Sequence, residues 1–260
     1  MKNNIFTKYQ QFNKGVKLDN RKKYYLVLDT ETAGDFKSPL VYDFGYCIVD
    51  KKGKIYKEYN VIIEETFNDI PLMEKSYFAN KLPDYVHKIN TGQLDKVKWA
   101  NAIMQMLEDI ITYNATVLCA YNLSFDMKAL NSTNMKYRNK TMDEIFNSME
   151  LLDIWTLATQ TIMARKNYIP FCIENGYYTK SKNVQTSAEV CYKFMKNDVD
   201  FVEDHTALSD VKIEVEIMAQ SFRMKKKIAS KFMPQPFRIV NHKDNYKERT
   251  EMIYQHENQG

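Results

Sequence analysis

Several features that mark secreted, membrane or zinc-stabilised proteins are missing from this sequence of 260 residues. The four cysteines (47, 119, 172 and 191) lie far apart and form no CxxC pair, which favours buried, reduced thiols over disulfides or a zinc site. No apolar run approaches about 18 residues, so we expect no membrane contact. The basic N-terminal stretch leads into no apolar h-region and is not a secretory signal. These absences predict a cytoplasmic protein.

Strong charge is also lacking. The net charge is only +4, which permits a polyanionic partner without arguing for one. With 44% hydrophobic and 27% charged residues, the chain can bury a full core and fits a soluble globular domain. We expect a basic N-terminal arm over residues 1–22 and a folded domain over 23–227. The remaining residues, 228–260, show little periodicity and are expected to form a tail. Such a tail would be available to contact a partner or substrate, and the alternative is a disordered or domain-wrapping end.

Hydrophobic patterning predicts an α/β fold. Three strand patterns with one tight connection, the KKGK turn, indicate an antiparallel meander, and later strand–helix units add parallel strands. We therefore expect a mixed five-stranded sheet with helices on both faces. The expected strands are residues 24–29, 41–50, 55–63, 115–122 and a short strand from 149. The expected helices are 96–112, 124–138 with Ser124 as N-cap, one capped near Asp153, 186–196 and 205–227.

Two carboxylates stand at the end of the first strand. Residues i and i+2 of a strand point to the same side, so Asp29 and Glu31 project together. Their mutual repulsion grows with burial, and a hard divalent cation such as Mg²⁺ or Mn²⁺ offsets it. The alternative is that the strand has already ended and that both acids are solvated.

Further acidic residues follow later elements. Asp126 comes just after a buried strand, where the alternative role is simply a favourable charge in a first helical turn. His205 precedes Asp210 by five residues, a spacing that places them on different faces if both are helical. We therefore expect His205 on a loop and Asp210 on the helix that follows. The alternative roles are a surface histidine and a solvated acid.

Together these segments resemble the DEDD family of 3′-to-5′ exonucleases, which have a ribonuclease H-like fold. DTETAG (29–34) is similar to the first motif, D-x-E-[TS]-x-G; NLSFD (122–126) to the second, N-x-x-F-D; and HTALSD (205–210) to the third, H-x-x-x-x-D. The sister branch has Tyr at the position of Thr206, so the chain resembles the histidine branch (DEDDh). That branch includes the epsilon proofreading subunit of bacterial replicative DNA polymerase, and FCIENGYYTK (171–180) resembles phage-borne relatives of that subunit.

The resemblance implies a two-metal mechanism and a set of site residues. Asp29, Glu31, Asp126 and Asp210 would hold two Mg²⁺ or Mn²⁺ ions per site. His205 would take a proton from the attacking water, and a nucleoside 5′-monophosphate would be released. The last nucleotide would be gripped around Thr32, with Ala33, Phe36 and Phe125 nearby and Asn122 at the strand-to-helix turn. For Phe125, core packing is an equal alternative.

The resemblance therefore implies an exonuclease acting on the 3′ end of single-stranded DNA in a bacterial or phage-infected cell. A role in proofreading or DNA replication would require a DNA polymerase or another replication protein as partner, because the sequence contains no polymerase domain. A 3′-to-5′ exoribonuclease of the same family is the first alternative, because no motif encodes contact with a 2′-hydroxyl. A non-catalytic module that docks on a polymerase is the second, and the intact acidic residues and His205 argue against it.

Overall fold

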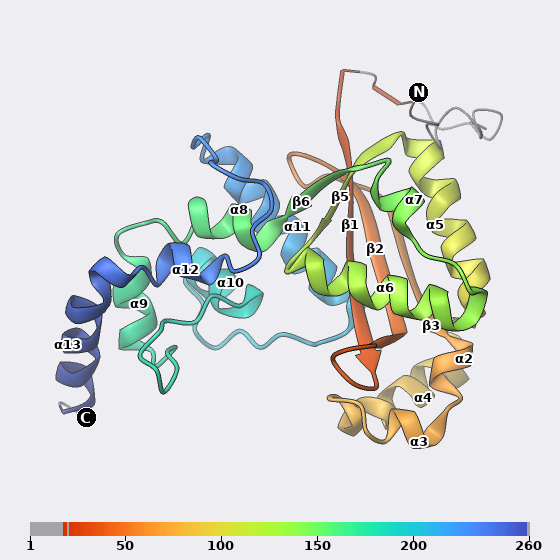
Figure 1. The fold of residues 1–260 in the computed structure, drawn as a ribbon, viewed down its shortest axis with the longest axis horizontal. Helices are drawn as coiled ribbons and strands as arrows, with labels where there is room; N and C mark the ends of the chain where they lie inside the picture. Colours follow the sequence, from red (N-terminus) through yellow and green to blue (C-terminus); the bar gives the residue numbers. More distant parts are fainter. Residues whose placement is uncertain (1–17, 20, 259–260) are drawn as a thin grey trace.

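The structure is a computed structural model, and it describes residues 18, 19 and 21–258. A six-stranded sheet with the order β4-β3-β2-β1-β5-β6 forms its centre (Figure 1). Strands β1, β2 and β3 pair antiparallel, whereas β4, β5 and β6 each run parallel to a neighbour. The strands are β1 (Tyr24–Ala33), β2 (Leu40–Asp50), β3 (Ile55–Ile63), β4 (Asp95–Val97), β5 (Ala115–Ala120) and β6 (Glu150–Asp153).

Helices cover both faces of the sheet, as expected (Figure 1). Alternate residues of β1 enter two different cores: Leu26 packs with the helices α5 and α6, and Val27 packs with α8, α10 and α11. The continuous apolar run at the start of β1 is explained by this burial on both sides. The helices are α5 (Trp99–Tyr113), α6 (Leu123–Arg138), α7 (Asp143–Phe146), α8 (Ile154–Gln160), α10 (Ala188–Lys196) and α11 (Ala207–Arg223).

The prediction of five strands was wrong by one strand. The sixth strand, β4, has only three residues and pairs in parallel with the end of β3. Its Asp95 and Lys96 are exposed, so it lacks the apolar alternation by which a strand is recognised in a sequence. Before it lies a segment of short helices, residues 64–90, that packs near the end of β1 and that we call the helical insert. Its helices are α2 (Glu64–Phe67), α3 (Ile70–Met73), η2 (Ala79–Lys81) and α4 (Leu82–Asn90).

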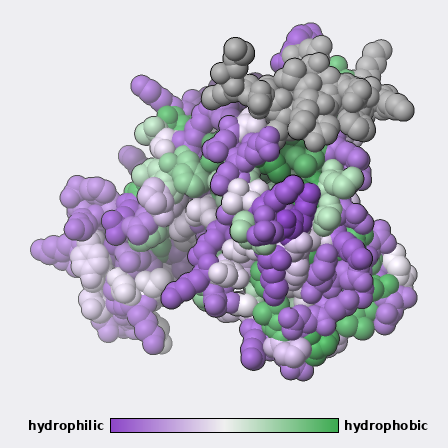
Figure 2. All heavy atoms as spheres, turned by 45° about the vertical axis from the view of Figure 1, so that its right-hand side comes forward, coloured by the Kyte–Doolittle hydropathy of each residue, from purple (hydrophilic) through white to green (hydrophobic). Residues whose placement is uncertain are grey.

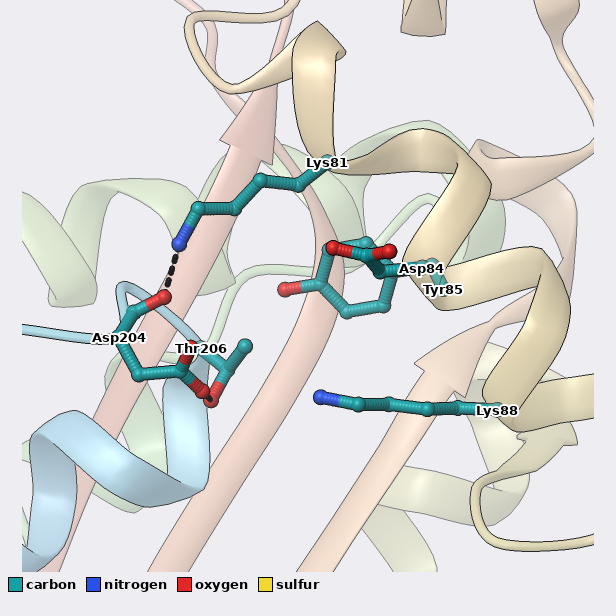
Figure 3. Close-up of a pocket in the computed structure, with 6 residues that line it drawn as sticks. All are labelled: Lys81, Asp84, Tyr85, Lys88, Asp204 and Thr206. Carbon is teal, nitrogen blue, oxygen red and sulfur yellow. Dashed lines mark hydrogen bonds between the residues drawn. The ribbon is translucent and has the colours of Figure 1, made fainter.

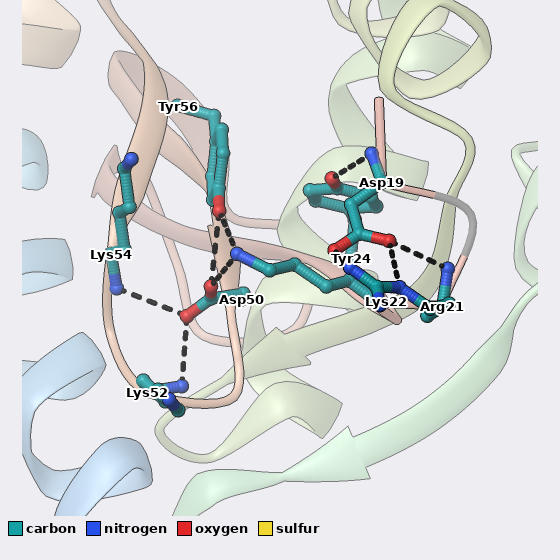
Figure 4. Close-up of polar contacts among 8 residues, drawn as sticks. All are labelled: Asp19, Arg21, Lys22, Tyr24, Asp50, Lys52, Lys54 and Tyr56. Carbon is teal, nitrogen blue, oxygen red and sulfur yellow. Dashed lines mark hydrogen bonds and ion pairs between the residues drawn. The ribbon is translucent and has the colours of Figure 1, made fainter. Parts of the chain in front are cut away.

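The β2–β3 turn is organised by Asp50, as Figure 4 shows. Its Oδ1 accepts backbone hydrogen bonds from Lys52 (2.9 Å) and Lys54 (3.3 Å). Its Oδ2 accepts from Lys22 Nζ at 3.0 Å and from the Tyr56 hydroxyl at 3.1 Å. Asp50 therefore links Lys22, which precedes β1, to the β2–β3 hairpin, whose turn lies beside the start of β1.

The C-terminal residues form helices that pack on the rest of the chain. α12 (Phe237–Val240) contacts α8, and α13 (Tyr246–Glu257) contacts α9 (Tyr168–Glu174), with η3 (Lys243–Asn245) between them. The buried guanidinium of Arg249 donates through Nε to the Lys182 carbonyl at 2.9 Å and through Nη2 to Asn183 Oδ1 at 3.2 Å. The expected domain boundaries at residues 22 and 227 stay predictions, and residues 1–17 and 20 of the expected arm lie outside the described residues.

All four cysteine thiols are buried and unpaired, as predicted. Within residues 18, 19 and 21–258, none of the helices combines the length and the apolar character needed to cross a membrane. Figure 2 shows a face on which hydrophilic side chains predominate and hydrophobic ones form small, separated groups.

Candidate active site

The first two acidic residues lie on the face of β1 that α11 covers. Asp29 continues the side of the strand from which Tyr25 and Val27 enter the core beside α11. Glu31 lies one pleat further along and is 9% exposed. A register shift follows directly between Glu31 and Thr32. This bulge shifts the pairing of β1 with β2 directly beside the two carboxylates, and bulges of this kind are common next to active sites.

A glycine lets α11 approach these carboxylates. Gly45 pairs with Asp29 across the sheet. A Cβ at this position would lie 2.6 Å from the backbone nitrogen of Leu208 and 2.7 Å from the carbonyl carbon of Ala207. The first turn of α11 therefore packs directly on the backbone of β2, and this contact brings Asp210 over the end of β1.

Three carboxylates meet at this point. Asp29, Glu31 and Asp210 each offer an oxygen, and these oxygens lie within 4.8 Å of one another. Carboxylate oxygens at this spacing form the donor set that Mg²⁺ and Mn²⁺ prefer. The residues present therefore fit a divalent ion.

Asp126 approaches the same site from α6. It is 2% exposed, and its Oδ1 accepts a hydrogen bond from Thr30 Oγ1 at 2.9 Å. The turn before α6 is held by Asp153, which accepts from the backbone nitrogens of Asn122 (3.0 Å) and Leu123 (3.2 Å). The predicted cap at Asp153 is confirmed, because its carboxylate also accepts from the Thr156 backbone nitrogen and begins α8.

The predicted N-cap at Ser124 was wrong. Helix α6 begins at Leu123, and its N-cap residue is Asn122, whose φ of 67° places it in the left-handed region. The Ser124 hydroxyl donates to Asn122 Oδ1 at 3.0 Å instead of capping the helix. Asn tolerates this conformation better than most residues, so Asn122 provides the sharp turn from β5 into α6.

The carboxyl groups of this site resist ionisation together. Burial raises the pKa of Asp29 well above its ordinary value, and the charges of neighbouring acidic residues add to this shift. Burial, followed by the charge of Asp210, raises the pKa of Glu31 to about 9. Burial also raises the pKa values of Asp126 and Asp210 to about 8 each. A bound divalent cation would reverse these shifts, since opposite charge favours the ionised carboxylate.

His205 lies on the loop before α11, as predicted, whereas Asp210 lies in the first turn of that helix. The backbone of His205 is left-handed, with φ of 47°. Its imidazole stacks on Phe78 of the helical insert, and its Nδ1 is 3.6 Å from Glu203 Oε2. Burial lowers the pKa of His205, and the positive charge of Lys81 lowers it further.

The helical insert also holds this loop through polar contacts. Figure 3 shows a small cavity between η2, α4 and the start of α11, where Lys81 Nζ donates to the Asp204 carbonyl. Beside it, the buried Asp43 accepts hydrogen bonds through Oδ2 from the Tyr85 hydroxyl (2.8 Å) and from the Ala207 backbone nitrogen (3.1 Å). The insert therefore fixes the position at which α11 begins.

The residues expected to contact substrate differ in exposure. Phe36 is 78% exposed, and Asn122 is also exposed. Thr32 and Phe125 are half-buried, and Phe125 belongs to none of the three hydrophobic clusters of the described residues. Ala33 is 1% exposed and packs in the cluster of the helical insert, so its side chain faces the core.

Four residues of this region were not singled out from the sequence. Gly45 and Asp43 lie inside a strand, Phe78 lies in a segment without periodicity, and Glu214 lies on α11 one turn beyond Asp210. The spacing of four residues between Asp210 and Glu214 is the one signal that could have found Glu214, because it places two acids on one helical face.

Comparisons with known proteins identify shared structure and little shared sequence. No family model and no curated protein matches the chain. The zinc-bound complex of E. coli exonuclease I with single-stranded DNA matches with a TM-score of 0.56 and 14% identity, covering 80% of this chain and 42% of that one. Exonuclease I from Methylocaldum szegediense matches with a TM-score of 0.52 and 16% identity, covering 88% of this chain and 45% of that one. The chain thus spans less than half the length of these enzymes, and over that part it shares the fold of exonuclease I.

Proposed function

We propose that the protein is a metal-dependent 3′-to-5′ exonuclease that removes nucleotides from single-stranded DNA. One observation carries this proposal: carboxylates from the first and third motifs, Asp29, Glu31 and Asp210, converge within 4.8 Å. They do so in a fold shared with exonuclease I, one structure of which holds single-stranded DNA. The preference for DNA over RNA rests on that complex.

Each acidic residue has a proposed role at the scissile phosphate. Asp29 lies near Glu31 and Asp210, feels the charge of Asp126 and would contact both of two Mg²⁺ or Mn²⁺ ions. Glu31 and Asp210 would hold the ion nearer the attacking water, and Asp126 would hold the other. When bound, two such ions stabilise the entering and the leaving oxygen of an in-line displacement.

His205 is the proposed general base. A neutral imidazole accepts a proton, and the lowered pKa of His205 keeps the ring neutral at physiological pH. Its loop position would let it reach the water that attacks the phosphorus. The broken bond is the terminal phosphodiester, and the product is a nucleoside 5′-monophosphate.

The end of the DNA strand would be held by residues around the same carboxylates. Phe36 is exposed, and Phe125 lies outside the hydrophobic clusters, so both have ring surface available for a base. Stacking on an aromatic ring contributes about 1–3 kcal/mol per base and tolerates any base. The backbone around Thr32 and the turn at Asn122 complete the proposed contact with the last nucleotide. The side chain of Ala33 is buried, so this residue would contribute only its backbone.

The histidine branch of the family is the proposed relationship, because Thr206 stands where the sister branch has Tyr. The motif order and residues 171–180 support a likeness to the epsilon proofreading subunit and its phage-borne relatives. A proofreading or replication-associated role in a bacterial or phage-infected cell follows from that likeness, with a DNA polymerase as partner.

A digestion panel tests this function. The substrates are 3′-labelled single-stranded DNA, single-stranded RNA, duplex DNA and DNA with a mismatched 3′ end, each with Mg²⁺ or with EDTA. We expect Mg²⁺-dependent release of mononucleotides, fastest from single-stranded DNA, and none from Asp29→Ala or Asp210→Ala. Preference for RNA would change the substrate, and wild-type rates in both variants would remove the metal assignment.

A further inference from the structure

Glu214 is a buried acidic residue that the proposed roles leave unused. It lies on α11, is 2% exposed, and its Oε2 has no hydrogen-bond partner among the described residues. A buried oxygen without a partner has lost its hydrogen bonds to water and gained none in return, so a residue of this kind calls for an explanation. A leucine would fill the same space on the helix without that loss.

The position of Glu214 directs its carboxylate toward the candidate active site. It follows Asp210 by four residues, and this spacing places the two side chains on the same face of α11. That helix packs on β1 and β2, the strands that carry Asp29 and Gly45. Burial raises the pKa of Glu214, whereas Tyr121, which directly follows β5, lies close enough for its backbone nitrogen to favour the ionised form and so lower the pKa of that group.

The charges around Glu214 are acidic. Those that act on it most strongly belong to Asp126 and then Asp210. In turn, Glu214 influences Asp29 more strongly than Glu31 or Asp210 does, and only Asp126 among the acidic residues exceeds it. Asp29 thus belongs to the group with Glu31 and Asp210, and it also feels the charges of Asp126 and Glu214.

We propose that Glu214 is a fifth acidic residue of the metal site and strengthens the binding of the ion that Asp126 holds. Its free Oε2 provides an acceptor for that ion or for water that the ion carries. Glu214 and Asp126 both lie outside the group whose oxygens are within 4.8 Å of one another, and Asp126 is the charged neighbour that acts most strongly on Glu214, so we assign Glu214 to the second ion. This inference rests on the metal site of the proposed function, and it assigns a binding residue that the three motifs do not contain.

Mn²⁺ titration without nucleic acid tests the inference, with free Mn²⁺ followed by electron paramagnetic resonance. The variant Glu214→Gln keeps the shape of the side chain and removes its charge. We expect the affinity for one Mn²⁺ to fall about 10- to 100-fold, the usual effect of losing a group that supports metal ligands. The matched control is Glu216→Gln on the same helix, whose carboxylate is 46% exposed and pairs with Lys196. It should bind Mn²⁺ as the wild type does.

The outcomes separate this inference from the proposed function. If the wild type binds Mn²⁺ and Glu214→Gln binds each ion as tightly as the wild type does, Glu214 has no part in the metal site, while the exonuclease proposal stands. If the wild type binds no Mn²⁺, both proposals fail. A second variant, Glu214→Leu, covers the case in which Gln disturbs the fold. It should melt no lower than the wild type without metal, yet gain less in melting temperature from Mn²⁺.

Discussion

The imidazole of His205 stacks on the ring of Phe78, with 4.7 Å between the ring centroids and 18° between the ring planes. The two residues come from segments far apart in the sequence, the loop before α11 and the helical insert after β3. A stacked ring has few orientations open to it. We therefore expect Phe78 to act as a positioning residue for the proposed general base.

Removing this stack should slow catalysis without weakening DNA binding. We expect Phe78→Ala to lower kcat about 10- to 100-fold, because a misplaced catalytic group loses the advantage of its orientation. KM should change little, and Phe78→Tyr, which keeps the stack, should restore kcat. The measurement is steady-state digestion of a 3′-labelled strand. Val86→Ala, an exposed position on α4, is the control. An equal loss in Phe78→Ala and Val86→Ala would refute the positioning role.

His205 itself should act on turnover rather than on the ions. We expect His205→Ala to lower kcat about 100- to 10,000-fold, the range that general acid–base groups contribute. Mn²⁺ affinity should stay close to that of the wild type, measured by calorimetry on the protein alone. Asp210→Ala serves as the comparison and should lose Mn²⁺ affinity. If His205→Ala loses as much as Asp210→Ala does, His205 is a metal ligand.

Gly45→Ala should damage the metal site although Gly45 carries no functional group. The added Cβ would lie 2.6 Å from the Leu208 nitrogen, so the first turn of α11 must move away from β2. Overpacking of this kind costs about 1–3 kcal/mol of stability. Asp210 would move with the helix, so Mn²⁺ affinity should fall as well.

Urea unfolding and Mn²⁺ titration check this prediction together. Gly92→Asn is the matched control, because a Cβ at Gly92 meets no atom within 4 Å and Asn tolerates a φ of 70°. Stability and Mn²⁺ affinity of Gly45→Ala that equal those of the control would show that α11 does not depend on this close approach.

The ion-free protein should lose stability as pH rises. Burial raises the pKa of Glu31 from 4.5 to about 9 and that of Asp210 from 3.8 to about 8. A carboxyl group that holds its proton more tightly in the folded chain stabilises the fold fully below its unfolded pKa. That contribution is lost as pH rises through the folded value. We therefore expect the melting temperature of the wild type in EDTA to fall between about pH 5 and about pH 9. The melting temperature of Asp210→Asn should fall less over the same range, because this variant lacks one of the two carboxyl groups.

Divalent ions should counteract this loss. At about pH 8, Mg²⁺ or Mn²⁺ should raise the melting temperature of the wild type, since a ligand that binds only the folded state stabilises it. Differential scanning fluorimetry with and without EDTA provides the measurement. An unchanged melting temperature across the pH range, with no effect of either ion, would contradict the idea that the carboxyl groups repel one another.

Local patterns in the sequence predicted much of the fold. The buried run at β1 and the alternation in β3 identify strands without tertiary information, and the spacing of apolar residues identifies α5 and α11. The segment beyond residue 228 was harder. The two fully buried residues of helix α13 are Arg249 and Ile253, and one of them is charged, so no continuous apolar stripe marks the segment as a helix.

The candidate site was predictable only in the residues that carry motifs. Asp29 and Glu31 directly follow an apolar run of the sequence, and Asp210 begins a helical pattern, and acidic residues beside apolar segments stand out because they are seldom buried. Gly45 and Asp43 act through close contacts with α11, which lies more than 160 positions later and can be placed only in three dimensions. The Ser124 cap failed for a related reason, because the start of α6 is set by Asp153 of a neighbouring strand.

Because the native thiols are buried, a single introduced cysteine near the candidate site can be labelled selectively. All four cysteines of the sequence lie in the interior, so a maleimide reagent has no native sulfhydryl on the surface to attack. Phe36, on the loop that follows Asp29 and Glu31, is largely open to solvent. A fluorophore attached to Phe36→Cys would therefore be carried at a single known position next to the carboxylates. Its emission would then report the arrival of a DNA end as it happens.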